Sequence, residues 1–255
     1  MFSILVVHVG TSRMTWALVG NRGFRAQGTA STAEIGTLAL RDWQNLPRPG
    51  RAVGVNAAGE AARVRVEGQI ARWRLHMQWL VPGKTGGGII NLHRPPAQLG
   101  PHRWASLVAA RRRAVASAPV APPCVVVNAG TLVTVDALDE GGIFRGGLIL
   151  PGPRLMLQAV AETSAMYKVA PGYFDDYPTT TPDSLVSGAM QAVCGAIEQM
   201  RTQRRVAGSD VMCYLTGAVA PDIAPYLSDP LEVVDNLVLE GVLALAAESD
   251  STFAA

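Results

Sequence analysis

The sequence predicts an α/β protein built from two similar halves, and three observations support this fold class. Hydrophobic residues make up 49% of the 255 residues and charged residues only 16%, which indicates a globular chain with a large buried core. The segment Val6–Thr11 is similar to the segment Val126–Thr131, 120 positions later, so each half begins in the same way. The second half then continues as apolar strands followed by helical patterns, which is typical of α/β proteins.

The repeated segment predicts a strand, a tight turn and a second strand. In each copy a β-branched run meets a Gly-Thr step, and a second strand-like stretch follows at Met14 to Val19 or at Leu132 to Leu138. Glycine lets the backbone approach a ligand closely, and threonine hydroxyls and successive N–H groups can face phosphate oxygens. Both copies are also compatible with ordinary hairpins. Together they make a candidate phosphate-binding pair.

The remaining elements follow from periodicity and breakers. The apolar start from Phe2 to Val9 predicts a buried strand, because it is too short to span a membrane and lacks a basic leader. The Pro-rich stretch 118–123 predicts a boundary, which gives halves at residues 1–117 and 118–255. The tail from Glu248 to Ala255 is expected to fray. Helices are expected at Arg103–Ala116, Pro153–Ser164, Ser184–Arg201 and Leu237–Glu248.

Cysteine content favours a cytoplasmic protein, whereas charge does not indicate a partner. The net charge of +2 is too small to indicate a nucleic-acid or membrane partner. The run Arg111 to Arg113 fits a solvated helix end, which the helix dipole favours. The three cysteines are far apart and form no C-x-x-C pair, so neither a disulfide framework nor a zinc cluster is expected.

Several common functional motifs are incomplete or absent in this sequence. Pro82 to Thr85 looks like the end of a P-loop, but the first glycine of that motif would fall at Gln78. Gly86 to Gly88 form no dinucleotide fingerprint and predict a loop. No nucleophile elbow is present, and the four histidines lack the spacing of a helical metal pair.

Three segments together resemble the type III pantothenate kinases. The first is His8 to Arg13, where the family has Asp-x-Gly-Asn-Thr/Ser. The second is Pro96 to Trp104, against Pro-x-x-Leu-Gly-x-Asp-Arg-Trp. The third is Asn128 to Asp136, continuing from Gly146 to Met156. Thr181 before Gly188 and the run Asn236 to Gly241 also match, so the resemblance spans nearly the whole chain, and its later part is similar to the subgroup called Bvg accessory factors.

The resemblance implies two ribonuclease H-like halves of the acetate and sugar kinase, heat-shock protein and actin superfamily, with a nucleotide cleft between them. It also implies a cytoplasmic homodimer that phosphorylates pantothenate with ATP, Mg²⁺ and K⁺ or NH₄⁺, the first step of coenzyme A synthesis. Thr181 of one subunit would approach the pantothenate pocket of the other.

The chain departs from the family at five features. The general base, the first-loop Asp that serves metal and ATP, and the second-loop Asp that helps hold a monovalent cation are replaced by His102, His8 and Asn128, respectively. The first-loop Asn is Thr11, and the Gly-Tyr pair of the substrate pocket is Leu92-His93. Up to three negative charges are therefore missing from a site that binds cations.

These replacements differ in their chemical consequence. An imidazole can accept a proton at neutral pH, so His102 is an acceptable catalytic base. Magnesium prefers hard oxygen ligands, so His8 should weaken metal binding. Asn128 keeps one carbonyl oxygen, and it is the doubtful candidate for a monovalent cation. Asp136 is as well explained by a strand-end surface position, and it is not expected to be catalytic.

The residues that match the family supply the remaining site predictions. Arg103 provides a donor suited to the carboxylate of pantothenate. His8 as a structural histidine, His93 as a loop surface residue and the turn glycines as hairpin glycines stay open as alternatives. Phosphate binding is predicted for His8, Gly10, Thr11, Ser12, Gly130, Thr131 and Thr134, and substrate binding for His93, Gly100, Arg103 and Thr181.

The sequence thus predicts a protein of this kinase family that is weak or inactive as an enzyme. The alternative is a non-catalytic accessory or transcription-regulatory protein, a pseudokinase that keeps the fold as an interaction surface. A nucleic-acid role is the least favoured.

Overall fold

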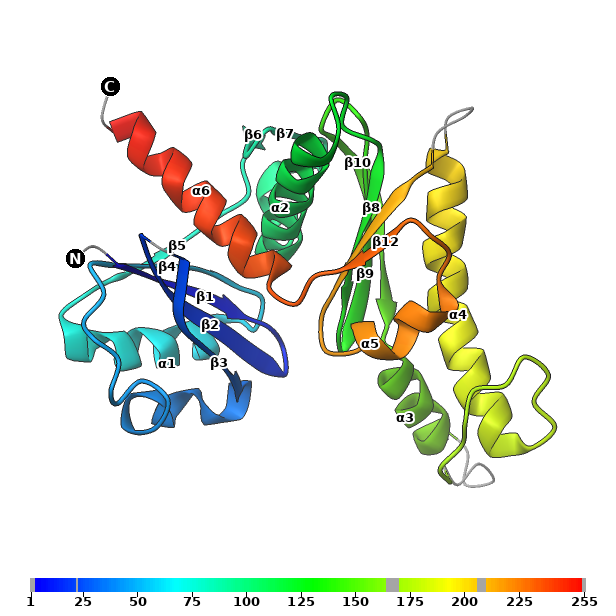
Figure 1. The fold of residues 1–255 in the computed structure, drawn as a ribbon. Coiled ribbons are helices and arrows are strands. Elements are labelled where there is room, and N and C mark those ends of the chain that lie inside the picture. The colour runs from blue at the N-terminus through cyan, green and yellow to red at the C-terminus, as the bar shows by residue number, and fades with distance from the viewer. Residues whose placement is uncertain (1–2, 22, 164–169, 206–209, 254–255) are drawn as a thin grey trace. The chain divides into compact units, whose positions relative to one another are not determined.

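A computed structural model describes residues 3–21, 23–163, 170–205 and 210–253 as two compact units (Figure 1). The first unit contains Met1–Arg112 together with Asn236–Ala255, and the second contains Arg113–Asp235. Within the described ranges, no helix has both the length and the apolar character that crossing a bilayer requires.

The first unit is centred on a mixed sheet with the strand order β3-β2-β1-β4-β5. Strand β1 pairs antiparallel with β2 and parallel with β4. Five of the seven residues of β1 are apolar, because both faces of a central strand are covered. The strands are β1 (Ser3–Val9), β2 (Arg13–Gly20), β3 (Gly23–Ser31), β4 (Arg51–Asn56) and β5 (Met77–Trp79).

Alternate residues of this sheet enter two separate cores. One face, which includes Leu5 and Val7, packs with Trp16, Trp43 and Trp73 and with helix α1 (Glu60–Ile70) and the 3₁₀ segments η1 (Thr32–Leu40) and η2 (Ala71–Trp73). The other face, which includes Val6, packs against α2 (Pro101–Ser117) and α6 (Leu237–Phe253). His8 is two residues after Val6 in the same strand, so its side chain lies on the same face of the sheet, the one that α2 and α6 cover.

Between β5 and α2 the chain forms a short hairpin of β6 (Thr85–Gly86) and β7 (Ile89–Asn91), followed by η3 (Pro96–Gln98). The three glycines from Gly86 to Gly88 all have positive φ, and Gly87 and Gly88 make the turn. The predicted loop here is therefore a hairpin with a two-residue turn.

The strands of the second unit run in the order β12-β11-β8-β9-β10. Val125 and Val127 pack with Met190, Val193 and neighbouring residues of α4, so this helix covers one face of the sheet. The elements are β8 (Cys124–Ala129), β9 (Leu132–Leu138), β10 (Ile143–Pro151), α3 (Pro153–Thr163), α4 (Thr181–Arg204), β11 (Met212–Thr216), α5 (Ala220–Ile223), η4 (Ala224–Tyr226) and β12 (Leu231–Val233).

The two sheets repeat one topology. Strands β8, β9 and β10 form the same antiparallel meander as β1, β2 and β3, and β8 pairs parallel with β11 as β1 does with β4. Strands β5 and β12 complete the two sheets as parallel edge strands. The duplication expected from the sequence is therefore present, and each copy has the ribonuclease H-like strand order that the resemblance implies.

The compact units differ from the predicted division between residues 117 and 118, because the last helix belongs to the first unit and not to the second. Helix α6 follows the second copy in the chain, but Val238, Leu239 and Val242 pack on the sheet of the first unit. The halves 1–117 and 118–255 stay a prediction about the duplicated sequence. In the structure, residues Asn236–Ala255 pack with the first unit.

The predicted helices are present, with boundaries that differ by a few residues. Helix α4 begins three residues before the predicted Ser184, because Thr180 caps it: the Thr180 hydroxyl accepts a hydrogen bond from the Asp183 N–H. Helix α6 continues to Phe253, so the expectation of fraying from Glu248 is wrong up to that residue. Phe2, Ser164 and the last two residues of the predicted tail lie outside the described residues.

Gly241 allows the backbones of α6 and α2 to meet. A Cβ atom at this position would collide with the backbone carbonyl of Ala105. Gly195, in the middle of α4, has no atom within 4 Å of its would-be Cβ. Substitution by alanine should therefore change the stability of the protein in opposite directions at these two glycines.

We expect Gly195→Ala to raise the free energy of unfolding by up to about 1 kcal/mol, since alanine is the better helix former. Gly241→Ala should lower it by about 1–3 kcal/mol or more, because the helix must shift to relieve the collision. Urea unfolding of the two variants checks this. A stabilising Gly241→Ala would contradict the close approach of α6 and α2.

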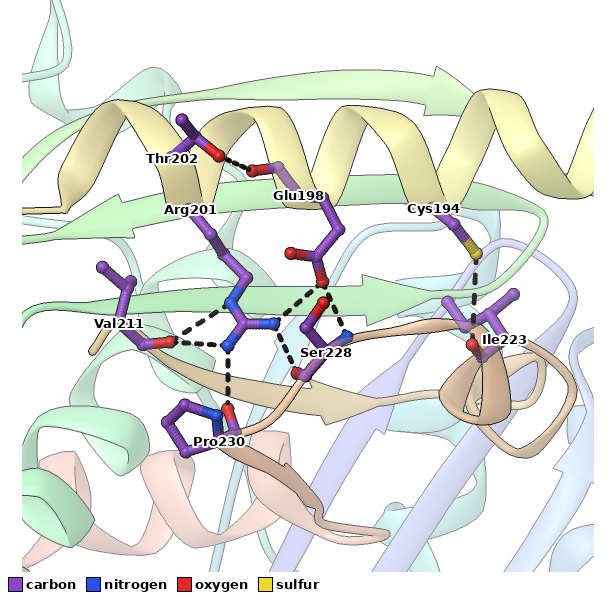
Figure 2. A network of polar contacts seen from close by, with 8 residues as sticks. All are labelled: Cys194, Glu198, Arg201, Thr202, Val211, Ile223, Ser228 and Pro230. Carbon is purple, nitrogen blue, oxygen red and sulfur yellow. Dashed lines mark hydrogen bonds and ion pairs between the residues drawn. The ribbon is translucent and has the colours of Figure 1, made fainter.

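A buried arginine ties the end of α4 to the strands beside it, as Figure 2 shows. Arg201 is 4% exposed, and its guanidinium forms an ion pair with Glu198 at 2.8 Å. It also donates to the carbonyls of Val211, Ser228 and Pro230, which precede β11 and β12. The Glu198 carboxylate in turn accepts from the Ser228 N–H. One side chain thus satisfies three carbonyls.

Replacing Arg201 should destabilise the protein strongly. Arg201→Met would remove the Arg201 donor from the Val211 and Ser228 carbonyls and the cation from Glu198, although the Pro230 carbonyl keeps the Cys213 N–H and Glu198 keeps the Ser228 N–H. Removing one partner of a buried pair costs about 3–5 kcal/mol. Arg204→Met, one turn further along the same helix, is the matched control and should change stability by less than about 0.5 kcal/mol. Chemical unfolding measures both, and equal effects would show that the network contributes nothing specific.

Candidate functional site

The first glycine turn links β1 and β2 and is held by the start of η1. The Gly10 N–H donates to the Arg13 carbonyl at 2.9 Å. Thr32 holds the turn from outside, because its hydroxyl donates to the Gly10 carbonyl at 2.9 Å and its N–H donates to the Ser12 carbonyl at 3.1 Å. Thr11 and Ser12 are exposed at the tip. The turn is therefore a fixed backbone cradle with two hydroxyls at its surface.

His8 lies two residues before this glycine and stacks on His102. The two ring centroids are 6.0 Å apart and the ring planes differ by 16°. His8 comes from β1, opposite Thr15 of β2, and His102 is the second residue of α2. The sheet face and the start of the helix thus bring together two residues that are 94 positions apart in the chain.

Both imidazoles are held in the neutral form. Burial, with a smaller contribution from the nearby His102, lowers the pKa of His8 from its ordinary value to about 3. Burial also lowers the pKa of His102 to about 4, with a further contribution from the Arg103 guanidinium. At neutral pH the pair therefore carries no charge.

The environment of His102 leaves one of its nitrogens available. Nδ1 is buried, and no residue that the structure describes hydrogen-bonds to it. A Cβ at position 100 would lie 3.0 Å from Cε1 and 3.3 Å from Nδ1 of this ring, so the Gly100 backbone lies close to that edge and a larger residue would crowd it. Arg103, the next residue, is buried at 6% exposure. A nitrogen without a hydrogen-bond partner is able to accept a proton.

Asn91 organises the loop that carries His93. Its buried side chain donates to the carbonyls of Gly83 at 3.0 Å and Pro96 at 3.1 Å, and it accepts from the His93 N–H at 2.9 Å. The Nδ1 atom of His93 lies 3.0 Å from the Pro95 carbonyl, which assigns the proton to Nδ1. The other ring nitrogen is then an acceptor.

The second glycine turn lies at the end of β8 in the second unit. The Gly130 N–H donates to the Leu132 carbonyl at 3.1 Å, so this turn is one residue shorter than the first. Gly152 donates its N–H to the Thr131 carbonyl at 2.8 Å. A Cβ at Gly152 would meet the Gly130 carbonyl, so the backbones are in close contact.

The pair Asn128 and Thr134 in this unit corresponds in register to His8 and Thr15 in the first. The Asn128 amide donates to the Thr134 hydroxyl at 3.4 Å, and both side chains are buried. Asp136 is also fully buried, so the expectation of a strand-end surface position is wrong. Thr181 is exposed at the first turn of α4.

The structure therefore groups the predicted residues within each unit. His8, Gly10, Gly100, His102 and Arg103 lie together in the first unit, and Thr11 and Ser12 are at the adjoining turn.

In the second unit Gly130, Thr131, Asn128 and Thr134 lie around one turn, and Thr181 is on a separate helix. The described contacts of His93 are with Asn91 and Pro95 and not with the histidine pair.

Sequence reasoning missed three supporting residues. Thr32 and Asn91 give no local signal, because their partners are backbone groups fixed only by the fold. Gly217 did have a local sequence signal, because this glycine directly follows the end of a strand, as the glycines of the two repeated Gly-Thr steps do. Gly217 has φ of 106°, and its Cα approaches the backbone of Ala129 beside the second turn.

Solved structures with this fold include nucleotide-binding proteins. The chain is similar to a Campylobacter jejuni protein described as a Baf family transcriptional activator, with a TM-score of 0.64, 18% identity and coverage of 97% and 99% of the two chains. It is also similar to the Clostridium difficile activator of 2-hydroxyisocaproyl-CoA dehydratase with bound ADPNP, with a TM-score of 0.54, 10% identity and coverage of 100% and 98%. The chain thus shares its duplicated α/β fold with these proteins.

Sequence similarity narrows this class to one family. The family model for type III pantothenate kinase matches residues 4–203. Curated type III pantothenate kinases from Acidovorax ebreus and Leptothrix cholodnii are 38% and 40% identical, each over 96% of this chain and over 96% and 97% of their own lengths. The chain belongs to the type III pantothenate kinase family.

The histidine pair should make the stability of the protein fall in acid. Unfolded histidines take up protons near pH 6.5, whereas folded His8 and His102 stay neutral down to about pH 4 or below. Their contribution is complete above pH 6.5 and is lost as the pH falls through this range, by up to about 1.4 kcal/mol per pH unit for each histidine.

Urea unfolding at several values between about pH 7 and about pH 5 measures this slope. We expect the double variant His8→Asn, His102→Asn to have a shallower slope than the unmodified protein. His76→Asn, which removes an exposed histidine, is the matched control and should keep the steep slope. Equal slopes in all three proteins would show that the pair is not held neutral.

Proposed function

We propose that the protein phosphorylates pantothenate with ATP, slowly when Mg²⁺ is the only divalent ion, and that His102 is the proton acceptor. The observation that carries the proposal is a neutral imidazole at the start of α2 whose Nδ1 is buried and has no partner among the described residues. Family membership supports the reaction, and the ADPNP bound to a protein of the same fold supports the nucleotide.

Proton acceptance by His102 is compatible with this chemistry. Burial brings the pKa of His102 to about 4, so its imidazole is neutral at physiological pH and able to accept a proton. Phosphoryl transfer depends more on positioning and electrostatic stabilisation than on early proton removal. The loss of charge therefore matters more than the change of base.

The neighbouring residues take the roles that their chemistry allows. Gly10, Thr11, Ser12, Gly130, Thr131 and Thr134 would bind phosphate through backbone N–H groups and hydroxyls. Arg103 would bind the pantothenate carboxylate, with Gly100, His93 and Thr181 as the other substrate contacts.

Magnesium does not fit the histidine pair. Mg²⁺ is held in proteins by carboxylate, phosphate and water oxygens, and His8 and His102 offer only nitrogens. No step of the reaction is therefore assigned to Mg²⁺ at these residues. Asn128 would offer an uncharged carbonyl oxygen to K⁺ or NH₄⁺ where the family has a carboxylate.

The alternative function is a non-catalytic accessory or regulatory protein of the Bvg accessory factor type, a pseudokinase. The loss of three carboxylates supports it, and a structure described as a transcriptional activator shares the fold. A homodimer with Thr181 contributed by the partner, and a cytoplasmic location, stay predictions.

The test compares turnover of the unmodified protein with that of His8→Asp, His102→Asp, Asn128→Asp. Pantothenate phosphorylation is measured with Mg²⁺, ATP and K⁺ or NH₄⁺. We expect the triple variant to be faster by about 10² or more, because the restored carboxylates offer Mg²⁺ oxygen ligands, and one electrostatic contact to a transition state is typically worth about 10² to 10³ in rate. His76→Asp introduces the same chemical change at an exposed position and should not alter the rate.

The outcomes separate the alternatives. Equal rates in the unmodified protein and the triple variant would show that histidine and asparagine replace the carboxylates fully, which contradicts slow turnover. No turnover by either folded protein would overturn the kinase proposal in favour of the accessory function.

A further inference from the structure

We propose that Asn91 is a positioning residue for pantothenate: it fixes the loop that carries His93, so that the Nε2 atom of His93 offers the substrate a hydrogen-bond acceptor. The inference rests on the proposed function, in which His93 contacts pantothenate. It adds the chemical class of the substrate group at that contact, which is a hydrogen-bond donor, an amide N–H or a hydroxyl. Asn91 acts through His93 and does not itself touch the substrate.

The side chain of Asn91 joins the two ends of this loop. Its Oδ1 accepts a hydrogen bond from the His93 N–H at 2.9 Å, where the loop begins. Its Nδ2 donates to the Pro96 carbonyl at 3.1 Å, where the loop ends, and to the Gly83 carbonyl at 3.0 Å, before the β6–β7 hairpin. The Asn91 residue is 2% exposed, so water does not compete for these bonds.

Only an amide satisfies this set of partners. Two carbonyl oxygens need donors and one N–H needs an acceptor, and the asparagine side chain supplies two N–H donors and one carbonyl oxygen. A carboxylate has the same shape but no proton to donate at neutral pH. Asn91→Asp would therefore set an acceptor against two carbonyl oxygens and open the loop without changing the volume of the side chain.

The closed loop sets the tautomer of His93. The Nδ1 atom of His93 lies 3.0 Å from the Pro95 carbonyl, and an oxygen acceptor at this distance requires the proton on Nδ1. The Pro95 carbonyl is itself held in place, because it also accepts from the Gln98 N–H at 3.1 Å and the next carbonyl is bound by Asn91. Nε2 of His93 is then an acceptor, and a polar substrate group that binds there must donate.

The start of α2 has anchors of its own and depends less on Asn91. Leu99, just before the helix, is fully buried, and Trp104 in its first turn is 2% exposed. The Trp104 N–H also donates to the Gly100 carbonyl at 3.0 Å. Opening the loop should therefore displace His93 while His102 keeps its place in the helix. The expected loss is one of pantothenate affinity and not of the rate of the bound complex.

The first measurement is the binding of pantothenate by isothermal titration calorimetry, which needs no turnover. We expect Asn91→Asp to lose about tenfold or more in affinity, and the KM for pantothenate to rise by the same factor with kcat unchanged. Ile70→Val, in the core on the opposite face of the sheet, is the control for a general loss of stability and should bind like the unmodified protein.

A double variant tests whether Asn91 acts through His93. If it does, Asn91→Asp combined with His93→Ala should bind pantothenate no more weakly than His93→Ala alone. Additive losses would overturn the proposal, as would an affinity that is unchanged in Asn91→Asp. No turnover by a protein that binds pantothenate would contradict the proposed kinase function alone, whereas no binding of pantothenate would overturn this inference as well.

The second measurement is the tautomer of His93, read from its ring-nitrogen NMR shifts at about pH 8, where an ordinary imidazole is neutral. It requires neither substrate nor activity, and in the unmodified protein it does not depend on a variant that folds. We expect the proton on Nδ1 in the unmodified protein and a mixture of tautomers in Asn91→Asp. A proton on Nε2 in the unmodified protein would overturn the proposal.

Discussion

The register of the central antiparallel hairpin is the constraint on which the site depends. Because β1 and β2 pair with Val9 opposite Met14, Gly10 starts the turn and residue 8 faces the side of the sheet that α2 covers. A slip of one residue would move His8 to the opposite face, into the core formed with Trp43 and Trp73. The second copy obeys the same rule, so Asn128 stands opposite Thr134 as His8 stands opposite Thr15. The two altered positions are thus equivalent places in a duplicated fold.

Electrostatics explains why the two histidines are compatible with each other. Two negative charges 6 Å apart repel by about 3 kcal/mol at an effective dielectric constant near 20, and a cation is needed to offset this. Two neutral imidazoles at the same distance carry no such repulsion. Burial of the rings keeps them neutral, since it lowers the pKa of both. The neutral pair therefore needs no cation to offset charge repulsion.

The sequence predicted the elements and the turns, but it could not predict the contacts between distant segments. The repeated Gly-Thr steps were enough to expect two hairpins, because a hairpin and its turn are determined by residues that are close in sequence. The contact of His8 with His102 depends on strand register and on the place of α2, and neither is local. Periodicity likewise identified α6 as a helix without indicating which sheet it covers. Arg201 was predicted only as the last residue of a helix, and the strands packed on α4 make it a buried donor.

The chemistry of the pair separates two properties that a carboxylate combines. An aspartate both accepts a proton and attracts a hard cation with its charge, whereas an imidazole whose pKa is about 4 keeps the first property and loses the second. His102 can therefore replace a general base nearly in kind, but His8 cannot replace a magnesium ligand. For a reaction whose transition state is stabilised mainly by positive charge around the phosphates, the loss of carboxylates that could hold a cation is a larger change than the replacement of one base by another.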